Sequence, residues 1–480
     1  MLAIAAQINT SELGTNYFQE THPEHLFAQC SHYCATVTDA AQMPRLLEVA
    51  IRHAVSQRGV SVLIVPGDIA LKEAPNPKPR LSFPEPTFSV WPSNTDLDRL
   101  ADLLNSSEKV TILGGAGCAD AHAELIALAK KLCAPIVHAL RGKEYIEYDN
   151  PFDVGMTGLL GSPAGYRAIM ACDTLLMVGT DFPYAQFYPE HAKIAQIDIR
   201  GEQIGRRCKI DLAVVGDAKT TLEKLLPKIQ GGRATKHLTS SLEQHREDRE
   251  DLDGQAPDHG LPGVIHPQHL TKVINEKASG DAIFTCDVRT PTVWAARYLT
   301  MNGRRRLVGS FCHGSMASAL PQAIGAQLAY PDRQVIALCG DGGLAMCLGD
   351  LLSLRQLELP VKVIVYRNDA LAFVEMEMKA AGILDFATDL VNPDFAMIGK
   401  ASGLLAIKAN ETFEVEAAIE QALAYKGPAI VEVAVARQEL SMPPTITFEQ
   451  AKGMGIFMLK AVLSGRGNEV IDLAKTNFLH

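Results

Sequence analysis

The chain has 480 residues, 47% hydrophobic and 21% charged, which is typical of a globular protein with about two to four domains. Its net charge of −10 at pH 7 and its lack of a basic run argue against nucleic acid as a partner. No apolar run reaches the roughly 18–20 residues that a membrane-spanning helix needs. The ten cysteines are scattered through expected strands and helices, as is usual in the reducing cytoplasm.

Residues 1–72 predict an incomplete α/β unit. One or two βα units are too few for an independent parallel sheet. Cys30 and Cys34 match no common zinc spacing, which favours ordinary packing. Residues 73–94 are rich in proline and predict a semi-rigid linker. The expected elements of the first unit are a strand at Leu2–Ala6, a helix at Met43–Ser56 and a strand at Val60–Val65.

Residues 95–228 alternate helix and strand, which predicts a doubly wound, Rossmann-like domain. The turn Gly114–Gly117 follows a strand and is compatible with a pyrophosphate cradle or with a plain structural turn. Expected strands are Val110–Leu113, Pro135–Ala139, Thr174–Val178 and Ile194–Ile199, and expected helices are Leu97–Leu104, Ala121–Leu132 and Thr220–Lys228. Residues 229–265 are charged and glycine-rich and predict a second linker, partly helical, with a solvated face.

A third domain is expected over residues 266–435, and its centre is the run from Val335 to Glu377. Val335–Cys339 has the composition of a buried parallel strand, and the glycines of the Gly340–Gly343 turn allow close approach to a ligand. A helix is expected next, ended by Pro360 before a second strand at Val361–Tyr366. The apolar side of that helix would comprise Leu344, Met346, Leu348, Leu351, Leu352, Leu354 and Leu357.

Two polar residues stand at the carboxyl ends of these strands. Asp341 follows the first strand and Asn368 follows the second, and ligands bind beyond the carboxyl ends of strands in open α/β sheets. Carboxylate and amide oxygens suit Mg²⁺, which completes its octahedron with phosphate oxygens and water. The spacing therefore predicts a magnesium site that anchors a phosphate-containing ligand.

The order strand, Gly-Asp-Gly-Gly, helix, strand, Asn resembles the thiamine diphosphate (ThDP) motif of the family that contains pyruvate oxidase, pyruvate decarboxylase and acetolactate synthase. The resemblance implies metal binding by Asp341 and Asn368 side chains and by the Ala370 carbonyl. Phe373 matches an aromatic residue near the reacting centre, and Met316 matches the bulky apolar residue beneath the thiazolium. Arg289 and Arg367 depart from the family, which commonly has glycine and asparagine there. The implied ThDP residues are Gly314, Ser315, Met316, Asp341, Gly342, Gly343, Asn368, Asp369, Ala370, Leu371, Ala372, Phe373 and Val374.

The middle domain resembles the flavin-binding domain of quinone-linked pyruvate oxidoreductases. The resemblance is carried by the runs 139–144, 156–161, 179–184 and 196–200. It implies FAD contacts by Leu159, Leu160, Gly161, Ser162, Phe182, Pro183, Tyr184, Ala185, Gln186 and Arg200. Some relatives keep this domain without a flavin, so a flavin-free domain is the alternative.

The last stretch, 436–480, carries Ile456, Phe457, Leu459, Val462 and Leu463 on one expected helix, with Lys460 and Arg466 nearby. Such a face packs on protein or lies in a membrane interface. By resemblance to the quinone-linked enzymes, we expect it to bind phospholipid at the inner face of the cell membrane.

The predicted fold class is therefore α/β, with three consecutive parallel-sheet domains and an amphipathic tail. The resemblance implies a homotetramer that oxidises pyruvate to acetate and CO₂ and passes electrons through FAD to a membrane quinone. It also indicates that residues 1–72 are the end of a pyrimidine-binding domain, so we expect further strands upstream, with the glutamate that activates ThDP. Two alternatives stay open: a catalytically inactive chain that still binds cofactor or partner subunits, and another ThDP enzyme such as acetolactate synthase.

Overall fold

The computed structural model describes residues 1–73, 89–232, 234–256, 265–437, 439, 444 and 448–478. The chain divides into two compact units, Met1–Ser89 and Val90–His480. Most of the predicted linker 73–94 lies outside the described residues. Within the described part, no helix is both long enough and apolar enough to span a bilayer.

The first unit is built on a three-stranded parallel sheet in the order β1-β3-β2. The predicted strands β1 and β3 and the predicted helix α2 are confirmed, but the sheet has one strand more than the sequence indicated. Strand β2 was missed because its four residues are all half-buried, so it shows neither an apolar run nor an alternation. The elements are β1 (Leu2–Gln7), α1 (Pro23–Phe27), β2 (Tyr33–Thr36), α2 (Met43–Ser56), β3 (Ser61–Pro66) and α3 (Gly67–Ala70).

The cysteines of this unit show no metal geometry. Cys30 is exposed and Cys34 is half-buried, so only Cys34 contributes to packing as expected. Among the residues that the structure describes, no three His, Cys, Asp or Glu side chains are placed to hold a metal ion.

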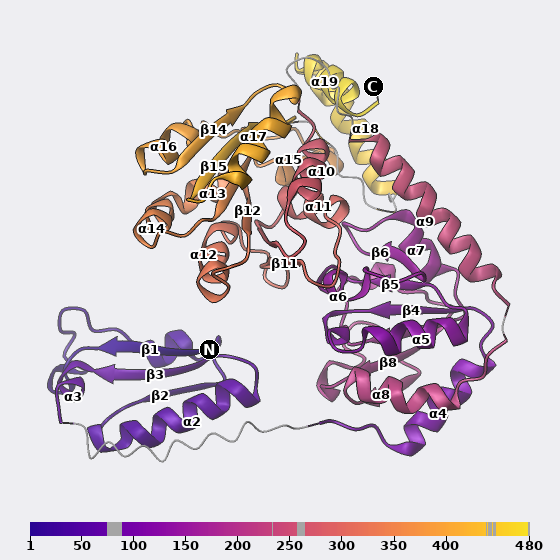
Figure 1. Cartoon of the computed structure of the whole chain (residues 1–480), viewed down its shortest axis with the longest axis horizontal. Coiled ribbons are helices and arrows are strands. Elements are labelled where there is room, and N and C mark those ends of the chain that lie inside the picture. Colours follow the sequence, from indigo (N-terminus) through magenta and orange to yellow (C-terminus); the bar gives the residue numbers. More distant parts are fainter. Residues whose placement is uncertain are drawn as a thin grey trace. The chain divides into compact units, whose positions relative to one another are not determined.

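The second unit begins with a six-stranded parallel sheet in the order β6-β5-β4-β7-β8-β9 (Figure 1). The order reverses between β4 and β7, which is the position where doubly wound sheets bind ligands beyond the strand ends. The predicted strands and helices of this region are confirmed. Its strands are β4 (Val110–Gly114), β5 (Ile136–His138), β6 (Asp153–Met156), β7 (Thr174–Val178), β8 (Lys193–Asp198) and β9 (Leu212–Val215). Its helices are α4 (Asn94–Ser106), α5 (His122–Leu132), α6 (Lys143–Ile146), α7 (Pro163–Met170) and α8 (Ala218–Leu225).

Both faces of this sheet are buried, as the near-continuous apolar strands require. Successive side chains point to opposite faces, so Ile112 packs with helices α4, α5 and α8 while its neighbour Leu113 packs with α7. The carboxyl ends of the strands are left open for loops.

Helix α9 (Lys236–Gly254) confirms that the predicted segment 229–265 is partly helical, and exposed Arg246 and Glu250 confirm its solvated charged face. Residues 257–264 lie outside the described part of the chain. The prediction missed the contacts that the other side of α9 makes with the protein. His237 lies 2.9 Å from the Thr111 hydroxyl, and the Asp248 carboxylate accepts from the Ala164 backbone N–H at 2.6 Å. Arg249 donates to the Arg297 carbonyl at 2.8 Å. The charged sequence concealed these contacts because they are made by polar groups and leave no apolar stripe.

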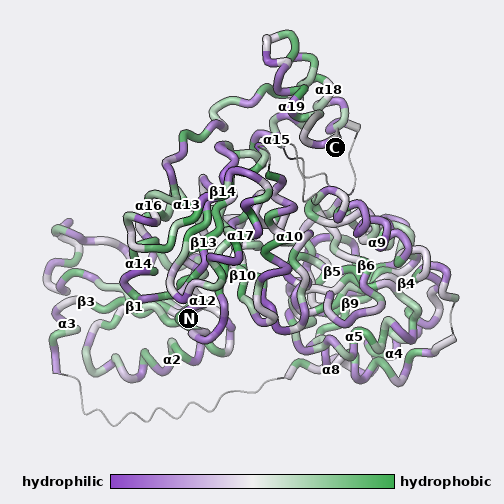
Figure 2. The backbone as a smooth tube through the Cα atoms, turned by 45° about the horizontal axis from the view of Figure 1, so that its top comes forward, coloured by the Kyte–Doolittle hydropathy of each residue, from purple (hydrophilic) through white to green (hydrophobic). Residues whose placement is uncertain are grey.

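A second six-stranded parallel sheet follows, in the order β11-β10-β12-β13-β15-β14. Its apolar strands, coloured green around β13 in Figure 2, lie between two layers of helices. Its strands are β10 (Ile283–Cys286), β11 (Arg306–Gly309), β12 (Val335–Gly340), β13 (Lys362–Arg367), β14 (Leu405–Ala409) and β15 (Ala429–Ala434). Its helices are α10 (Pro267–Lys277), α11 (Thr290–Tyr298), α12 (Ala319–Ala329), α13 (Asp341–Met346), α14 (Leu351–Gln356), α15 (Ala372–Ala380), α16 (Phe395–Ala401) and α17 (Thr412–Ala424).

The predicted helical stretch after β12 is confirmed, but it is not one continuous helix. The chain forms the short helix α13, a 3₁₀ turn at Leu348–Asp350 and the short helix α14. Leu344, Leu351 and Leu354 are buried, whereas Met346 is 66% exposed. The break changes the angular register of the side chains, so they do not form one continuous apolar face as a single helix would require.

The C-terminal helices α18 (Phe448–Leu463) and α19 (Gly467–Phe478) form a hairpin beside α15. Phe457 is only 1% exposed, so this member of the predicted apolar face packs on the protein, which was one of the two alternatives for that face. Gly453 permits this packing, because a Cβ there would lie 1.9 Å from the Ala380 carbonyl oxygen. The other predicted members of the face, Ile456, Leu459, Val462 and Leu463, remain exposed.

Candidate cofactor site

The centre of the site is the Asp341 carboxylate, which is 3% exposed and directly follows β12. Its Oδ2 accepts from the backbone N–H groups of Asn368 and Asp369 at 3.0 and 2.8 Å. The turn after β13 therefore wraps around the residue after β12, as the register of the two adjacent strands requires. Asp369 has a φ of 55° in this turn, which Asp tolerates better than most residues.

Asn392 completes the set of donors around Asp341, and no local pattern in the sequence identifies it. Its Nδ2 donates to Asp341 Oδ2 and to Asp369 Oδ1, each at 2.9 Å. It lies in a loop remote from both strands, so only the folded chain brings it here.

Asp287 is a second organiser that the sequence reasoning did not single out. It follows β10 as Asp341 follows β12, and that shared position could have identified it. Its carboxylate accepts from the backbone N–H groups of Ser318, Ala319 and Gly340 at 2.8, 3.0 and 3.1 Å. Gly343 lies against it, because a Cβ on Gly343 would be 2.1 Å from Asp287 Oδ2.

Burial raises the pKa of Asp341, while hydrogen bonds from Gly342, Asp369, Asn368 and Asn392 oppose that rise. Burial likewise raises the pKa of Asp287 against its three backbone donors. An ionised Asp341 in this setting carries an electrostatic cost, which a nearby divalent cation would relieve.

The residues fit the predicted magnesium ion. Asp341 Oδ2 accepts three described hydrogen bonds, whereas Oδ1 accepts one, from Gly342 at 2.8 Å, so Oδ1 retains capacity for a metal. Asn368 Oδ1 lies in the same turn, where it accepts from the Ala370 N–H at 3.2 Å. This oxygen-only donor set suits Mg²⁺.

A cavity of about 80 Å³ adjoins this centre. Met316 and Gly342 both line this cavity. They lie close together, since a Cβ on Gly342 would be 3.5 Å from the Met316 methyl carbon. Of the predicted ThDP residues, the cavity gathers Met316, Asp341, Gly342, Gly343 and the run Ala370, Leu371, Ala372, Phe373 and Val374. Gly314 and Ser315 are exposed and do not line the cavity. Asn368 and Asp369 do not line it either, but their backbone N–H groups donate to Asp341, which does.

Arg367 stands outside the donor set. Its guanidinium pairs with Glu432 at 3.0 Å and with Asp369 at 3.2 Å. These ion pairs hold the Arg367 guanidinium beside β15 and Asp369. The arginine therefore does not displace Asn368 from the proposed metal site.

The residues predicted to contact FAD lie in loops at the carboxyl ends of the middle sheet. Those from Leu159 to Ser162 follow β6, those from Phe182 to Gln186 follow β7, and Arg200 follows β8. The loops after β6 and β7 touch, since a Cβ on Gly158 would lie 3.0 Å from the Phe182 ring. Leu159 and Tyr184 are exposed there, whereas Gly161 and Phe182 are buried.

The glycine turn after β4 has a structural role. A Cβ on Gly115 would lie 2.6 Å from the Gly179 carbonyl oxygen, and one on Gly117 would lie 2.6 Å from Gly179 Cα. Close contact with the loop after β7 therefore explains these glycines without a pyrophosphate.

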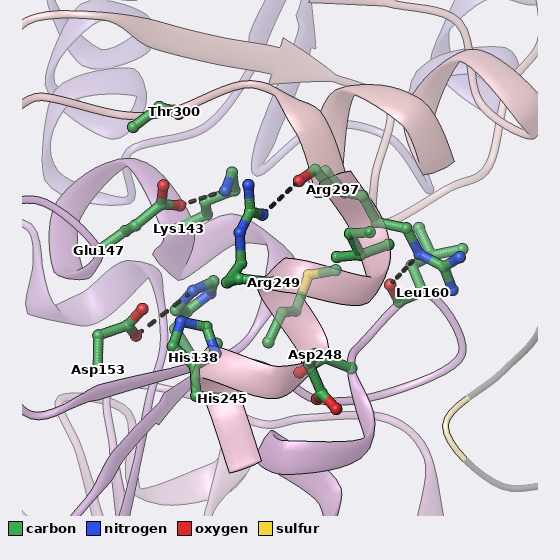
Figure 3. A pocket seen from close by; sticks show the side chains of 15 residues that line it. His138, Lys143, Glu147, Asp153, Leu160, His245, Asp248, Arg249, Arg297 and Thr300 are labelled. Carbon is green, nitrogen blue, oxygen red and sulfur yellow. Dashed lines mark hydrogen bonds and ion pairs between the residues drawn. The ribbon is translucent and has the colours of Figure 1, made fainter. Parts of the chain in front are cut away.

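A larger cavity of about 270 Å³ lies between β6, α9 and α11 (Figure 3). His138 faces Asp153, with Nε2 and Oδ1 3.7 Å apart, and burial lowers the pKa of His138 to about 3. Burial also lowers the pKa of His245 to about 4. Arg297 donates through Nε to the Leu160 carbonyl at 3.2 Å, so the cavity lies behind the predicted flavin loop. Its polar groups connect the two sheets of the second unit.

The buried carboxylate, the turn around it and the adjoining cavity define an α/β protein whose residues fit a metal-anchored cofactor. Two family models match the chain: "Thiamine pyrophosphate enzyme, central domain" over residues 97–225, and "Thiamine pyrophosphate enzyme, C-terminal TPP binding domain" over residues 287–433. Thiamine pyrophosphate is another name for ThDP. The chain belongs to the thiamine pyrophosphate enzyme family.

Curated relatives agree with this assignment. The "Putative thiamine pyrophosphate-containing protein YdaP" of Bacillus subtilis (strain 168) is 32% identical over 479 residues, covering 99% of this chain and 82% of YdaP. An uncharacterized 42.6 kDa protein of Pseudomonas amyloderamosa is 55% identical over 261 residues, covering 54% of this chain and 65% of that protein. Pyruvate oxidase of Lactiplantibacillus plantarum is 27% identical over 449 residues, covering 91% of this chain and 73% of that enzyme. Acetolactate synthases of maize and Escherichia coli are 27–28% identical to the chain.

Proposed function

We propose that the chain catalyses the oxidative decarboxylation of pyruvate to acetate and CO₂, with electrons passing through FAD to a membrane quinone. The observation that carries this proposal is the buried Asp341 carboxylate, wrapped by the Asn368 turn beside a cavity walled by Met316 and Phe373. Such an arrangement suits a cofactor with a diphosphate at one end and aromatic rings at the other.

When bound, ThDP supplies an electron sink for the loss of CO₂ from a 2-oxo acid. Asp341 Oδ1, Asn368 Oδ1 and the Ala370 carbonyl would hold Mg²⁺, which anchors the diphosphate and takes no part in proton transfer. Met316 and Phe373 would keep the cavity apolar and limit the access of water. Asp287 and Asn392 position the turns that carry these groups.

FAD, when bound, would accept the electrons released from the substrate. The proposed holders are the exposed loop residues after β6, β7 and β8, among them Leu159, Tyr184 and Arg200. The glycines after β4 are accounted for by loop packing, so the flavin proposal rests on the other loops.

The proposed link to a quinone rests on α18. Leu459, Val462 and Leu463 are 62%, 58% and 78% exposed, although Phe457 on the same helix is buried. An exposed apolar stripe on an otherwise docked helix suits shallow insertion into a lipid interface. We propose that the protein is a homotetramer that binds reversibly to the cytoplasmic face of the cell membrane.

The test is pyruvate-dependent reduction of an artificial electron acceptor by purified protein with ThDP, Mg²⁺ and FAD. Turnover that requires all three cofactors supports the proposal. Acetolactate formation without acceptor reduction would instead favour the acetolactate synthase reaction, in line with the relatives of that name. Tight ThDP binding without either product would indicate a non-catalytic cofactor-binding protein.

A further inference from the structure

Arg289 has a backbone conformation that residues other than glycine rarely adopt. It stands before the first turn of α11, with φ 93° and ψ −131°. Residues other than glycine are strained there, and such strain persists where the surrounding structure holds it in place, often at a ligand site. Arg289 also lines the cofactor cavity.

The Arg289 side chain reaches across the edge of that cavity to α15. Its Nη1 lies 3.7 Å from Glu377 Oε2, and its guanidinium carbon lies 5.4 Å from the centre of the Phe373 ring. The pair with Glu377 is long and solvent-accessible, with side chains 40% and 61% exposed, so it holds the guanidinium only weakly. The cation can therefore turn toward an anion in the cavity at little cost.

The cavity has groups besides Arg289 that suit an anion, although two carboxylates also line it. The N-terminal turns of α11 and α15, each nine residues long, both contribute lining residues, and helix N-termini carry partial positive charge. The lining carboxylates Asp287 and Asp341 are already engaged by backbone N–H groups. Among the described lining residues, Arg289 is the one side chain with a permanent positive charge.

We propose that Arg289 is a second cation for the diphosphate of ThDP, acting beside the divalent metal. The inference rests on the cofactor binding proposed above. On binding, the guanidinium exchanges Glu377 for diphosphate oxygens, where its planar fork makes charge-assisted hydrogen bonds. The consequence is diphosphate binding that depends less on Mg²⁺ than the metal ligands alone would allow.

The test is isothermal titration of the full chain with inorganic pyrophosphate and with ThDP, in EDTA and in saturating Mg²⁺. In EDTA, Arg289→Gly should weaken pyrophosphate binding about tenfold, the size of one charge-assisted contact. Arg289→Lys should fall between the two, because lysine keeps the charge and loses the fork. In saturating Mg²⁺ the loss should shrink to about threefold or less, since the metal then screens the diphosphate.

Two further variants separate this role from a general effect of charge or folding. Glu377→Gln releases Arg289 and should tighten pyrophosphate binding in EDTA by about twofold to threefold. Arg304→Gln removes an equal charge from an exposed residue before β11 and should leave binding unchanged. Thermal melting checks that each variant is folded.

Equal affinity of wild type and Arg289→Gly in EDTA would overturn the inference. Tighter binding by Arg289→Gly would also overturn it, by showing that the side chain obstructs the cavity. If wild type fails to bind ThDP even with Mg²⁺, the proposed cofactor falls, and the inference falls with it. The ThDP titration in Mg²⁺ thus distinguishes the two failures.

Discussion

Replacing Asp341 with alanine removes the group around which the site is assembled. It leaves four donors without their acceptor: the backbone N–H groups of Gly342, Asn368 and Asp369, and the Asn392 amide. An unpaired buried donor costs about 1–3 kcal/mol. Water from the adjoining cavity can pair with some of these donors. The variant also no longer buries a carboxylate, and burial of that group is unfavourable, as the raised pKa of Asp341 shows. We therefore expect the free energy of unfolding to fall by about 2–4 kcal/mol.

Urea unfolding, with and without Mg²⁺ and ThDP, measures both the structural loss and the metal role. Ligand at a hundredfold excess over its Kd should stabilise wild type by about 2.7 kcal/mol and Asp341→Ala by nothing measurable. Asn392→Ala is the matched control, because it removes one donor to Asp341 and no proposed metal ligand. It should lose about 1–2 kcal/mol and keep its response to ligand. Equal stabilisation of Asp341→Ala and wild type by the ligand would refute the assignment of Asp341 to the metal.

His245 has a folded-state pKa of about 4, below its ordinary value of 6.5, so the unfolded chain binds more protons between these values. The stability that the neutral imidazole contributes is therefore present above pH 6.5 and lost as the pH falls toward 4. In urea unfolding, His245→Gln should reduce the loss of stability between pH 7 and pH 5 by about 1–2 kcal/mol. An unchanged loss would show that His245 does not cause this pH dependence. Arg289→Gly should raise the unfolding free energy without cofactor by about 1 kcal/mol, because relieved strain exceeds the added chain entropy, whereas a loss of stability would show that the backbone is not strained. The double variant Leu459→Glu with Leu463→Glu should abolish co-sedimentation with liposomes and leave activity with a soluble acceptor intact, since both side chains are exposed. Undiminished liposome binding would contradict the role given to α18.

Deleting residues 457–480 would be a less informative test of the tail. Phe457 is buried, with the Lys379 ammonium 5.2 Å from its ring centre, and Lys460 donates to the Gly382 carbonyl at 2.7 Å. The deletion would uncover α15, whose first residues line the cofactor cavity. Point substitutions on the exposed side of α18 avoid this complication.

The sequence alone was sufficient for many of the elements and for the proximity of Asp341 and Asn368. Buried parallel strands are runs of apolar residues, so β7, β12 and β13 could be recognised from composition. The carboxyl ends of neighbouring strands meet at one sheet edge, so the sequence is enough to place Asp341 and Asn368 together. Amphipathic periodicity likewise located α2, which begins and ends at the predicted residues.

What the sequence left open depends on contacts between distant residues. Asn392 reaches Asp341 from a loop that carries no pattern, and α9 is held by polar contacts that look like a solvated surface. Phe457 and Leu459 have similar hydrophobicity, yet only the packing of α18 on α15 decides that one is buried and the other exposed. The φ of Arg289 and its reach toward Glu377 are likewise set by α11 and α15 together. Local residue chemistry thus determined many of the elements and which strand ends carry polar residues, because those properties follow from neighbours in sequence. The partner of each side chain was decided by the tertiary structure, because it depends on how separate elements pack.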